Sequence, residues 1–190
     1  MDAPVLRTTR LLLRLPRLSD AQALLDYQLR NRTRLAASAP ARDEMFFSLP
    51  GQTKEIENAL TTFKLAKGYR FLVFIEKDES RVVGIVAVTE IVRGAFQAAF
   101  LGYGIDGERE GEGLMTEAIE AVIKFAFDNL HLHRVMANVI PENERSQRLL
   151  RRLGFEFEGR AREYLLLDGR WRDHILTAKL NPRWIPQCEV

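Results

Sequence analysis

The sequence contains a single cysteine, Cys188, and it has no long apolar run. One cysteine excludes an internal disulfide, which is typical of proteins in a reducing compartment. No stretch approaches the ~18 apolar residues of a membrane span. The amino-terminal residues 1–4 lack the apolar run and cleavage site of a signal peptide. We therefore expect a cytoplasmic protein that does not bind a membrane.

Charge is also nearly balanced, because the net charge is only +2. That value is too small to indicate nucleic acid or membrane binding, so we expect no sequence-specific contact with nucleic acid. The length of 190 residues fits one domain, and 46% hydrophobic residues are enough to build a core. We predict a single domain over residues 1–190.

The amino-terminal half predicts one strand, two helices and a loop. A strand is expected at 11–13, and Ser19 can cap a helix with apolar residues at helical spacing. Residues 33–50 contain prolines and small residues typical of a loop. A second helix is expected from Thr53 to Lys67, ended by Gly68.

The remaining chain is richer in strand patterns. We predict strands at 71–75, 82–88, 98–105 and 135–140, a long helix after Gly113, a helix over 143–153 ended by Gly154, and a closing hairpin of 155–167 and 171–180. This order predicts an α/β fold with a mixed sheet of six to seven strands, flanked by four helices.

The segment from Ile105 to Met115 carries the clearest chemical signal. A strand, a glycine-containing loop and the start of a long helix follow one another directly. The first amides of a helix have no partner within it, so such a loop can bind a phosphate or pyrophosphate. An ordinary helix cap would give the same pattern. The glycines at 102, 104 and 107 match a dinucleotide motif only by chance, because no helix starts after Gly107.

A second segment, residues 141–155, reads as a capped amphipathic helix. Asn143 can cap it, Ser146 lies one turn further on, and Gly154-Phe155 closes it. Together the two segments resemble the GCN5-related N-acetyltransferase (GNAT) superfamily. The family loop motif [QR]xxGx[GA] maps onto residues 110–115, and the family's later helix maps onto Asn143, Ser146 and Gly154-Phe155.

The resemblance is closest to the RimJ/RimL branch, the ribosomal-protein alanine N-acetyltransferases, and to RimJ-type sequences within it. It extends from Leu11 to Trp184 and is carried by residues 92–96, 101–103, 113–115, 133–138 and 164–174. The resemblance implies a mostly antiparallel, twisted and splayed sheet, with acetyl-CoA as co-substrate and no metal. It also implies a cofactor site made of Tyr103, Gly104, Ile105, Glu110, Gly111, Glu112, Gly113, Leu114, Met115, Asn138 and Asn143.

Catalytic roles follow from the same resemblance. Ser146 is the candidate that protonates the departing thiolate, and Glu163 is the candidate base, with Glu90 and Glu158 as other options. Each also has a structural interpretation: a helix serine bonded to backbone, or a solvated strand carboxylate. His131 and His133 lack a metal-ligand spacing, and we expect them to be structural.

Three positions depart from the family pattern. Glu110 replaces the usual Gln or Arg, Leu150 replaces the Tyr that many members use as an acid, and Ser38 replaces a Trp of RimJ-like sequences. These departures bear on cofactor affinity, on the acid and on the acceptor, respectively.

The acceptor implied by the resemblance is the amino-terminal α-amine, with alanine first, of a ribosomal protein. The attacking amine must be neutral, and deprotonation at pH 7 costs about 1.4 kcal/mol for an α-amine against about 4–5 kcal/mol for lysine. A site without an obvious strong base therefore favours an α-amine. Two alternatives remain: an acetyltransferase for a small-molecule amine such as a polyamine, amino sugar or antibiotic, and a non-catalytic acyl-CoA-binding assembly protein.

Overall fold

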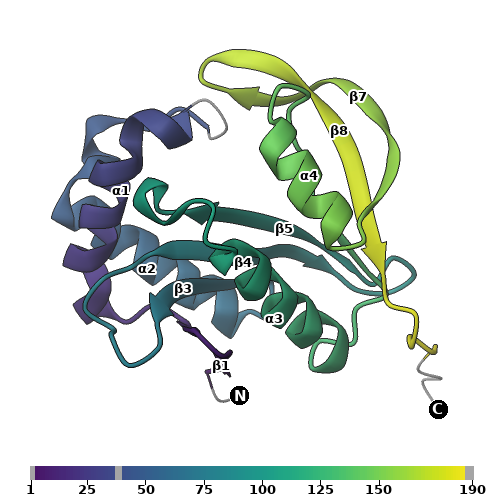
Figure 1. Cartoon of the computed structure of the whole chain (residues 1–190), viewed down its shortest axis with the longest axis horizontal. Helices are drawn as coiled ribbons and strands as arrows, with labels where there is room; N and C mark the ends of the chain where they lie inside the picture. The colour runs from purple at the N-terminus through teal and green to yellow at the C-terminus, as the bar shows by residue number, and fades with distance from the viewer. Residues whose placement is uncertain (1–2, 37–39, 187–190) are drawn as a thin grey trace.

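One mixed sheet forms the centre of the molecule, with helices on both faces (Figure 1). The computed structural model describes residues 3–36 and 40–186. In the described residues the sheet has eight strands in the order β1-β2-β3-β4-β5-β6-β8-β7, and only β5 and β6 are parallel. The strands are β1 (Val5–Arg7), β2 (Leu11–Arg14), β3 (Tyr69–Ile75), β4 (Gly84–Val92), β5 (Ala98–Ile105), β6 (Arg134–Met136), β7 (Glu156–Leu167) and β8 (Arg170–Leu180).

Alternation along the central strands gives each face of the sheet its own core. On one face Leu12, Leu72 and Phe74 pack with helices α1 (Ala21–Ala36) and α2 (Leu49–Lys64). On the other face Leu13 and Phe71 pack with helices α3 (Leu114–Asp128) and α4 (Glu144–Arg152). Because both faces are covered, β3 is a nearly continuous apolar segment.

The expected mixed, mostly antiparallel sheet with four helices is confirmed, while the strand count is eight instead of six to seven. The additional strand is β1, which has only three residues and is too short to show a recognisable strand pattern in the sequence. The strand expected at 135–140 is shorter, Arg134–Met136, because the chain after Met136 no longer pairs with β5, although its hydrogen bonds to β8 continue.

The segment predicted as a loop, 33–50, is partly helical. Helix α1 continues to Ala36, and α2 begins at Leu49 instead of Thr53. Ser48 caps α2, and Pro50 lies in its first turn, where proline is tolerated. The helix ends at Lys64, ahead of Gly68, and Ala66 takes a left-handed conformation just after it, with a φ of 53°. Ser38 lies outside the described residues.

Strands β5 and β6 separate after a short parallel stretch, and this splay positions the site. Their last pair is Phe100 with Met136. Beyond it, the Ala137 N–H donates to the Thr177 carbonyl of β8 at 2.9 Å, and Val139 exchanges two hydrogen bonds with Ile175. The edge of β5 from 101 to 105 is therefore left without a strand partner on the β6 side, within the part of the chain that the structure describes.

Candidate functional site

The loop between β5 and α3 has a backbone that needs glycine at two places. Gly111 and Gly113 have φ values of 83° and 77°, in the left-handed region that L side chains rarely adopt. Gly113 is also the residue that caps α3, and it has no side chain to bond the first amides of the helix. Those N–H groups stay available to an anion, and the helix dipole favours one there.

Arginine and asparagine side chains from distant parts of the chain fix this loop. Asn31 on α1 accepts a hydrogen bond from the Gly107 N–H at 2.9 Å. Arg34 donates to the carbonyl of Ile105 at the end of β5. Arg10 donates to the carbonyl of Glu112 at 2.9 Å. Because these contacts hold carbonyls and the start of the loop, the amides before α3 are kept in place.

Asp106 anchors the base of the loop and is almost fully buried. Its carboxylate accepts hydrogen bonds from Arg30 at 3.0 Å and from Arg81 at 2.9 Å. Burial by itself raises the pKa of Asp106, but the bonds from Arg81 and Arg30 outweigh burial and hold the pKa below its ordinary value. Asp106 therefore stays ionised and serves structure.

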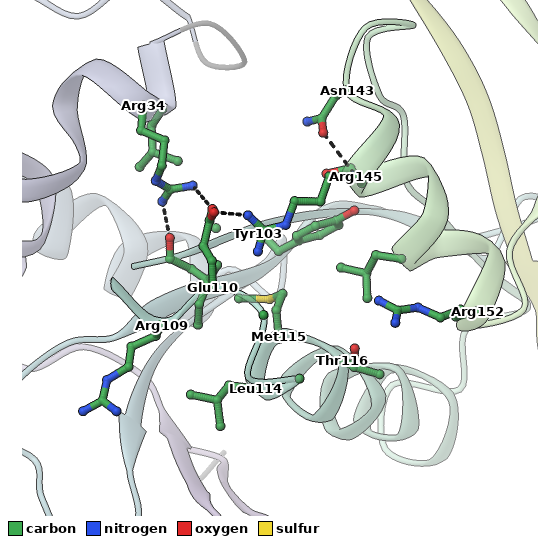
Figure 2. Close-up of a pocket in the computed structure, with 17 residues that line it drawn as sticks. Arg34, Tyr103, Arg109, Glu110, Leu114, Met115, Thr116, Asn143, Arg145 and Arg152 are labelled. Atoms are coloured by element: carbon green, nitrogen blue, oxygen red, sulfur yellow. Dashed lines mark hydrogen bonds and ion pairs between the residues drawn. The ribbon is translucent and has the colours of Figure 1, made fainter. Parts of the chain in front are cut away.

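The other loop acids are also paired with arginines. Glu108 contacts Arg81, and Glu112 lies 3.6 Å from Arg109. Glu110 pairs with Arg34 of α1 at 2.8 Å and with Arg145 of α4 (Figure 2). Ion pairs therefore neutralise a loop that is acidic in sequence.

A cavity lies between this loop, the end of α1, the end of β5 and the facing sides of α3 and α4 (Figure 2). We name it the α3–α4 cavity. Most of the residues predicted to bind the cofactor line it: Tyr103, Gly104, Ile105, Glu110, Gly111, Gly113, Leu114, Met115 and Asn143. Segments about 40 residues apart in sequence thus meet at one site.

Three predicted residues lie elsewhere. Glu112 borders a separate depression with Arg10. Asn138 lies just after β6 and donates to the Tyr164 hydroxyl of β7 at 3.2 Å. Glu163, the residue before Tyr164 on β7, is exposed and donates its N–H to the Asp173 side chain, and it is not among the residues lining the α3–α4 cavity.

Ser146 lies on the cavity side of α4, facing Tyr103 of β5. The Ser146 N–H bonds to the Asn143 side chain at 3.1 Å, so Asn143 caps α4 as expected. Burial raises the pKa of Tyr103, and the Ser146 hydroxyl partly offsets this. The phenol oxygen of Tyr103 is buried and has no hydrogen-bond partner among the described residues. Two hydroxyl groups thus lie next to each other in the cavity wall.

Leu150, where many family members have a tyrosine, is fully buried in the core and supplies no proton donor. The other candidate bases have structural surroundings. Glu158 pairs with Arg134, and Glu90 is exposed beside the irregular part of β4. His133 contacts Trp184 edge-on, at the opposite end of β5 from the cavity.

Sequence patterns missed several lining residues. Arg34 and Leu35 come from the end of α1, and Arg109, Thr116, Leu149 and Arg152 come from elements whose motifs we had recognised. Leu149 and Arg152 follow Ser146 at intervals of three residues, so helical spacing was an available signal for both. No local signal pointed to α1.

The geometry matches what an acyl-CoA needs. Free helix amides and arginines suit its phosphates, and an open strand edge offers backbone groups to an extended pantetheine arm. Among residues 3–36 and 40–186, no cluster of His, Cys, Asp or Glu could hold a metal ion. Across the same residues, no helix is long and apolar enough to cross a membrane.

Comparison with known families agrees with the geometry. The family model described as an acetyltransferase (GNAT) domain matches residues 10–156. The chain belongs to the GNAT acetyltransferase family. This GNAT enzyme is 42% identical to the [ribosomal protein uS5]-alanine N-acetyltransferase of Escherichia coli (strain K12), over 95% of this chain and 93% of the relative. It is an N-acetyltransferase of the RimJ/RimL type, and its predicted fold class is confirmed.

Two solved structures resemble this GNAT enzyme over nearly its whole length. The ribosomal-protein-S5-alanine acetyltransferase of Vibrio fischeri superposes with a TM-score of 0.89 at 37% identity, covering 96% of this chain and all of that one. RimJ of Mycobacterium smegmatis, in complex with CoA-disulfide, superposes with a TM-score of 0.86 at 27% identity, covering 97% and 89% of the two chains. The GNAT family uses acetyl-CoA.

Proposed function

We propose that this enzyme transfers the acetyl group of acetyl-CoA to the amino-terminal α-amine of a cytoplasmic ribosomal protein that begins with alanine. The observation that carries the proposal is the 42% identity to the Escherichia coli enzyme, which extends over both the cofactor loop and the β7–β8 hairpin. The structural match to the Vibrio fischeri protein supports the same acceptor.

Acetyl-CoA binding is proposed at the α3–α4 cavity. The amides after Gly113 hold the pyrophosphate, Arg145 adds charge, and the open edge of β5 beyond Phe100 takes the pantetheine arm. A thioester at the far end of that edge lies at the splay, near Ser146 and Tyr103. Backbone N–H groups at the splay polarise its carbonyl.

An α-amine acceptor agrees with the lack of a strong general base in the site. The amine attacks the thioester carbonyl, the carbon–sulfur bond breaks, and the amine loses one proton while the thiolate gains one. Ser146 is the proposed donor to the thiolate. Glu163, through water, is the proposed acceptor of the amine proton, since an α-amine needs only about 1.4 kcal/mol of help at pH 7.

The test is a competition among acceptors. The enzyme, acetyl-CoA and an equimolar set of peptides copying ribosomal-protein amino termini are incubated, and product masses are read at early times. A peptide with amino-terminal alanine should react fastest, and the same peptide with a blocked α-amine and an internal lysine should react at least tenfold more slowly. Faster reaction of lysine, spermidine or an amino sugar would instead support a small-molecule acceptor.

A further inference from the structure

The turn between β1 and β2 is tied to the first turn of α3. The Glu117 carboxylate of α3 accepts hydrogen bonds from the Thr8 hydroxyl at 2.5 Å, from the Arg10 N–H at 2.9 Å and from the Arg10 Nε at 2.7 Å. Burial by itself raises the pKa of Glu117, but these bonds outweigh burial and hold the pKa below its ordinary value. The carboxylate therefore stays ionised and fixes both the backbone and the side chain of Arg10.

The same guanidinium reaches from Glu117 back to the loop before the helix. Its Nη1 donates to the Glu112 carbonyl at 2.9 Å, and its Nη2 lies 3.6 Å from the position that a Cβ on Gly113 would take. Arg10 and Glu112 border one depression and are not among the residues that line the α3–α4 cavity, whereas Gly113 lines the cavity. The peptide unit between Glu112 and Gly113 thus lies at the boundary between the depression and the cavity.

This peptide unit is trans, and in a planar trans peptide the C=O and the N–H point in opposite directions. Because the Glu112 carbonyl points to Arg10, the Gly113 N–H points away from Arg10, on the side of the α3–α4 cavity. That N–H donates no hydrogen bond to any of the described residues. It is therefore available to a ligand in the cavity.

Glycine at position 113 makes this orientation easy to lose. A flip of the peptide unit would exchange the directions of the C=O and the N–H, and it needs changes only in ψ of Glu112 and φ of Gly113. Since glycine populates positive and negative φ about equally, Gly113 does not oppose the flip. The orientation must then be selected by a contact to the Glu112 carbonyl from outside the loop, and Arg10 supplies that contact.

Given the proposed binding of acetyl-CoA at the α3–α4 cavity, we infer that Arg10 is a positioning residue that turns the Gly113 N–H toward the cofactor pyrophosphate. Glu117 holds the guanidinium, and the guanidinium holds the carbonyl of Glu112. The Gly113 N–H then faces the same anion as the first amides of α3. Because Arg10 acts through the backbone, its effect on affinity depends on the presence of the pyrophosphate.

The experiment compares CoA with pantetheine, the part of CoA that lacks the pyrophosphate and the nucleoside. Each ligand is titrated into isotope-labelled protein, and the amide NMR signals report both the affinity and the response of Gly113. In the unmodified protein the Gly113 amide proton should shift downfield with CoA and not with pantetheine. Arg10→Ala should remove this shift, weaken CoA binding about five- to tenfold and change pantetheine binding less than about twofold.

Arg7→Ala is the matched control. Arg7 lies on the adjacent strand β1, is more than half exposed and pairs with Glu76, so its removal takes away the same charge without affecting the Glu112 carbonyl. Both affinities and the Gly113 signal should stay unchanged. Glu117→Gln should show a smaller loss that is again selective for CoA. Added to Arg10→Ala, it should cause no further loss, because Glu117 acts through Arg10.

Equal losses of affinity for CoA and pantetheine in Arg10→Ala would overturn the inference, because the substitution would then have disturbed the cavity as a whole. An unchanged Gly113 shift with CoA in that variant would overturn it as well. The predicted pattern in a protein that acetylates no peptide would support the role of Arg10 and count against the proposed acceptor.

Discussion

The carboxylate of Glu110 pairs with the guanidinium of Arg145 and thereby joins the loop before α3 to the first turn of α4. Arg34 contacts the same carboxylate from α1, at 2.8 Å. Glu110 thus forms ion pairs with two arginines that line the α3–α4 cavity. A bound phosphate would compete with Glu110 for the same guanidinium groups.

Neutralising Glu110 should therefore tighten cofactor binding. In Glu110→Gln, the side chain no longer competes for Arg145, and we expect CoA affinity to rise about three- to tenfold, with the larger gain at low salt because the pairs are partly exposed. Calorimetry at two salt concentrations measures this. Glu108→Gln is the control, since it makes the same charge change but pairs with Arg81 outside the cavity. Weaker binding by Glu110→Gln would mean that the carboxylate holds the ligand directly.

Gly113 should be required for its backbone conformation. A Cβ built there has room, with Arg10 at 3.6 Å as its nearest neighbour, but φ is 77°. Gly113→Val must leave this conformation or accept roughly 1–2 kcal/mol of strain, so the amides before α3 lose their alignment. We expect at least tenfold weaker CoA binding at any salt concentration.

Gly94→Ala separates strain from binding. Gly94 also has positive φ, at 67°, with nothing near its Cβ position, and it lies in the turn between β4 and β5. Its substitution should cost similar stability in thermal unfolding without changing CoA affinity. Normal CoA binding by Gly113→Val would place the cofactor elsewhere.

Ser146→Ala should slow the chemical step. If Ser146 protonates the thiolate, kcat should fall about 10- to 100-fold with little change in CoA affinity, because Leu150 supplies no substitute. Rapid-mixing measurements with a good peptide acceptor show whether chemistry limits turnover. Tyr103→Phe should produce a smaller loss of the same kind, since its hydroxyl faces Ser146. An unchanged rate of the chemical step in Ser146→Ala would assign the serine to structure.

Asp106 should make stability depend on acid pH. Its pKa is below the ordinary value near 3.8 in the folded state, so the stabilisation is complete well above that value. It is lost as the pH falls through the lower folded pKa, because the folded state must then take up a proton against Arg81 and Arg30.

Asp106→Asn tests this directly. We expect a loss of about 1–3 kcal/mol in the free energy of unfolding at pH 7, measured by chemical denaturation. The difference from the unmodified protein should shrink as the pH is lowered below 4. A difference that stays constant from pH 7 to pH 3 would contradict the role of the charge.

The periodic parts of the molecule could be predicted from the sequence alone. Apolar runs located β3, β4 and β5, and Gly113 and Asn143 marked the starts of α3 and α4, because apolar runs and helix caps are local properties of the sequence. The motif residues around Ser146 likewise predicted which segments would meet in the cavity.

Contacts between distant segments were decided by the tertiary structure. Nothing near Arg34 in sequence indicates that it will bond to Glu110, 76 residues away. Nor does the sequence near Asp106 indicate that its carboxylate will accept hydrogen bonds from Arg30 and Arg81. An acidic loop became a phosphate-compatible site because packing brought these arginines to it. The point where β5 and β6 separate was also decided by the tertiary structure, since the chain after Met136 keeps its hydrogen bonds to β8 but no longer pairs with β5.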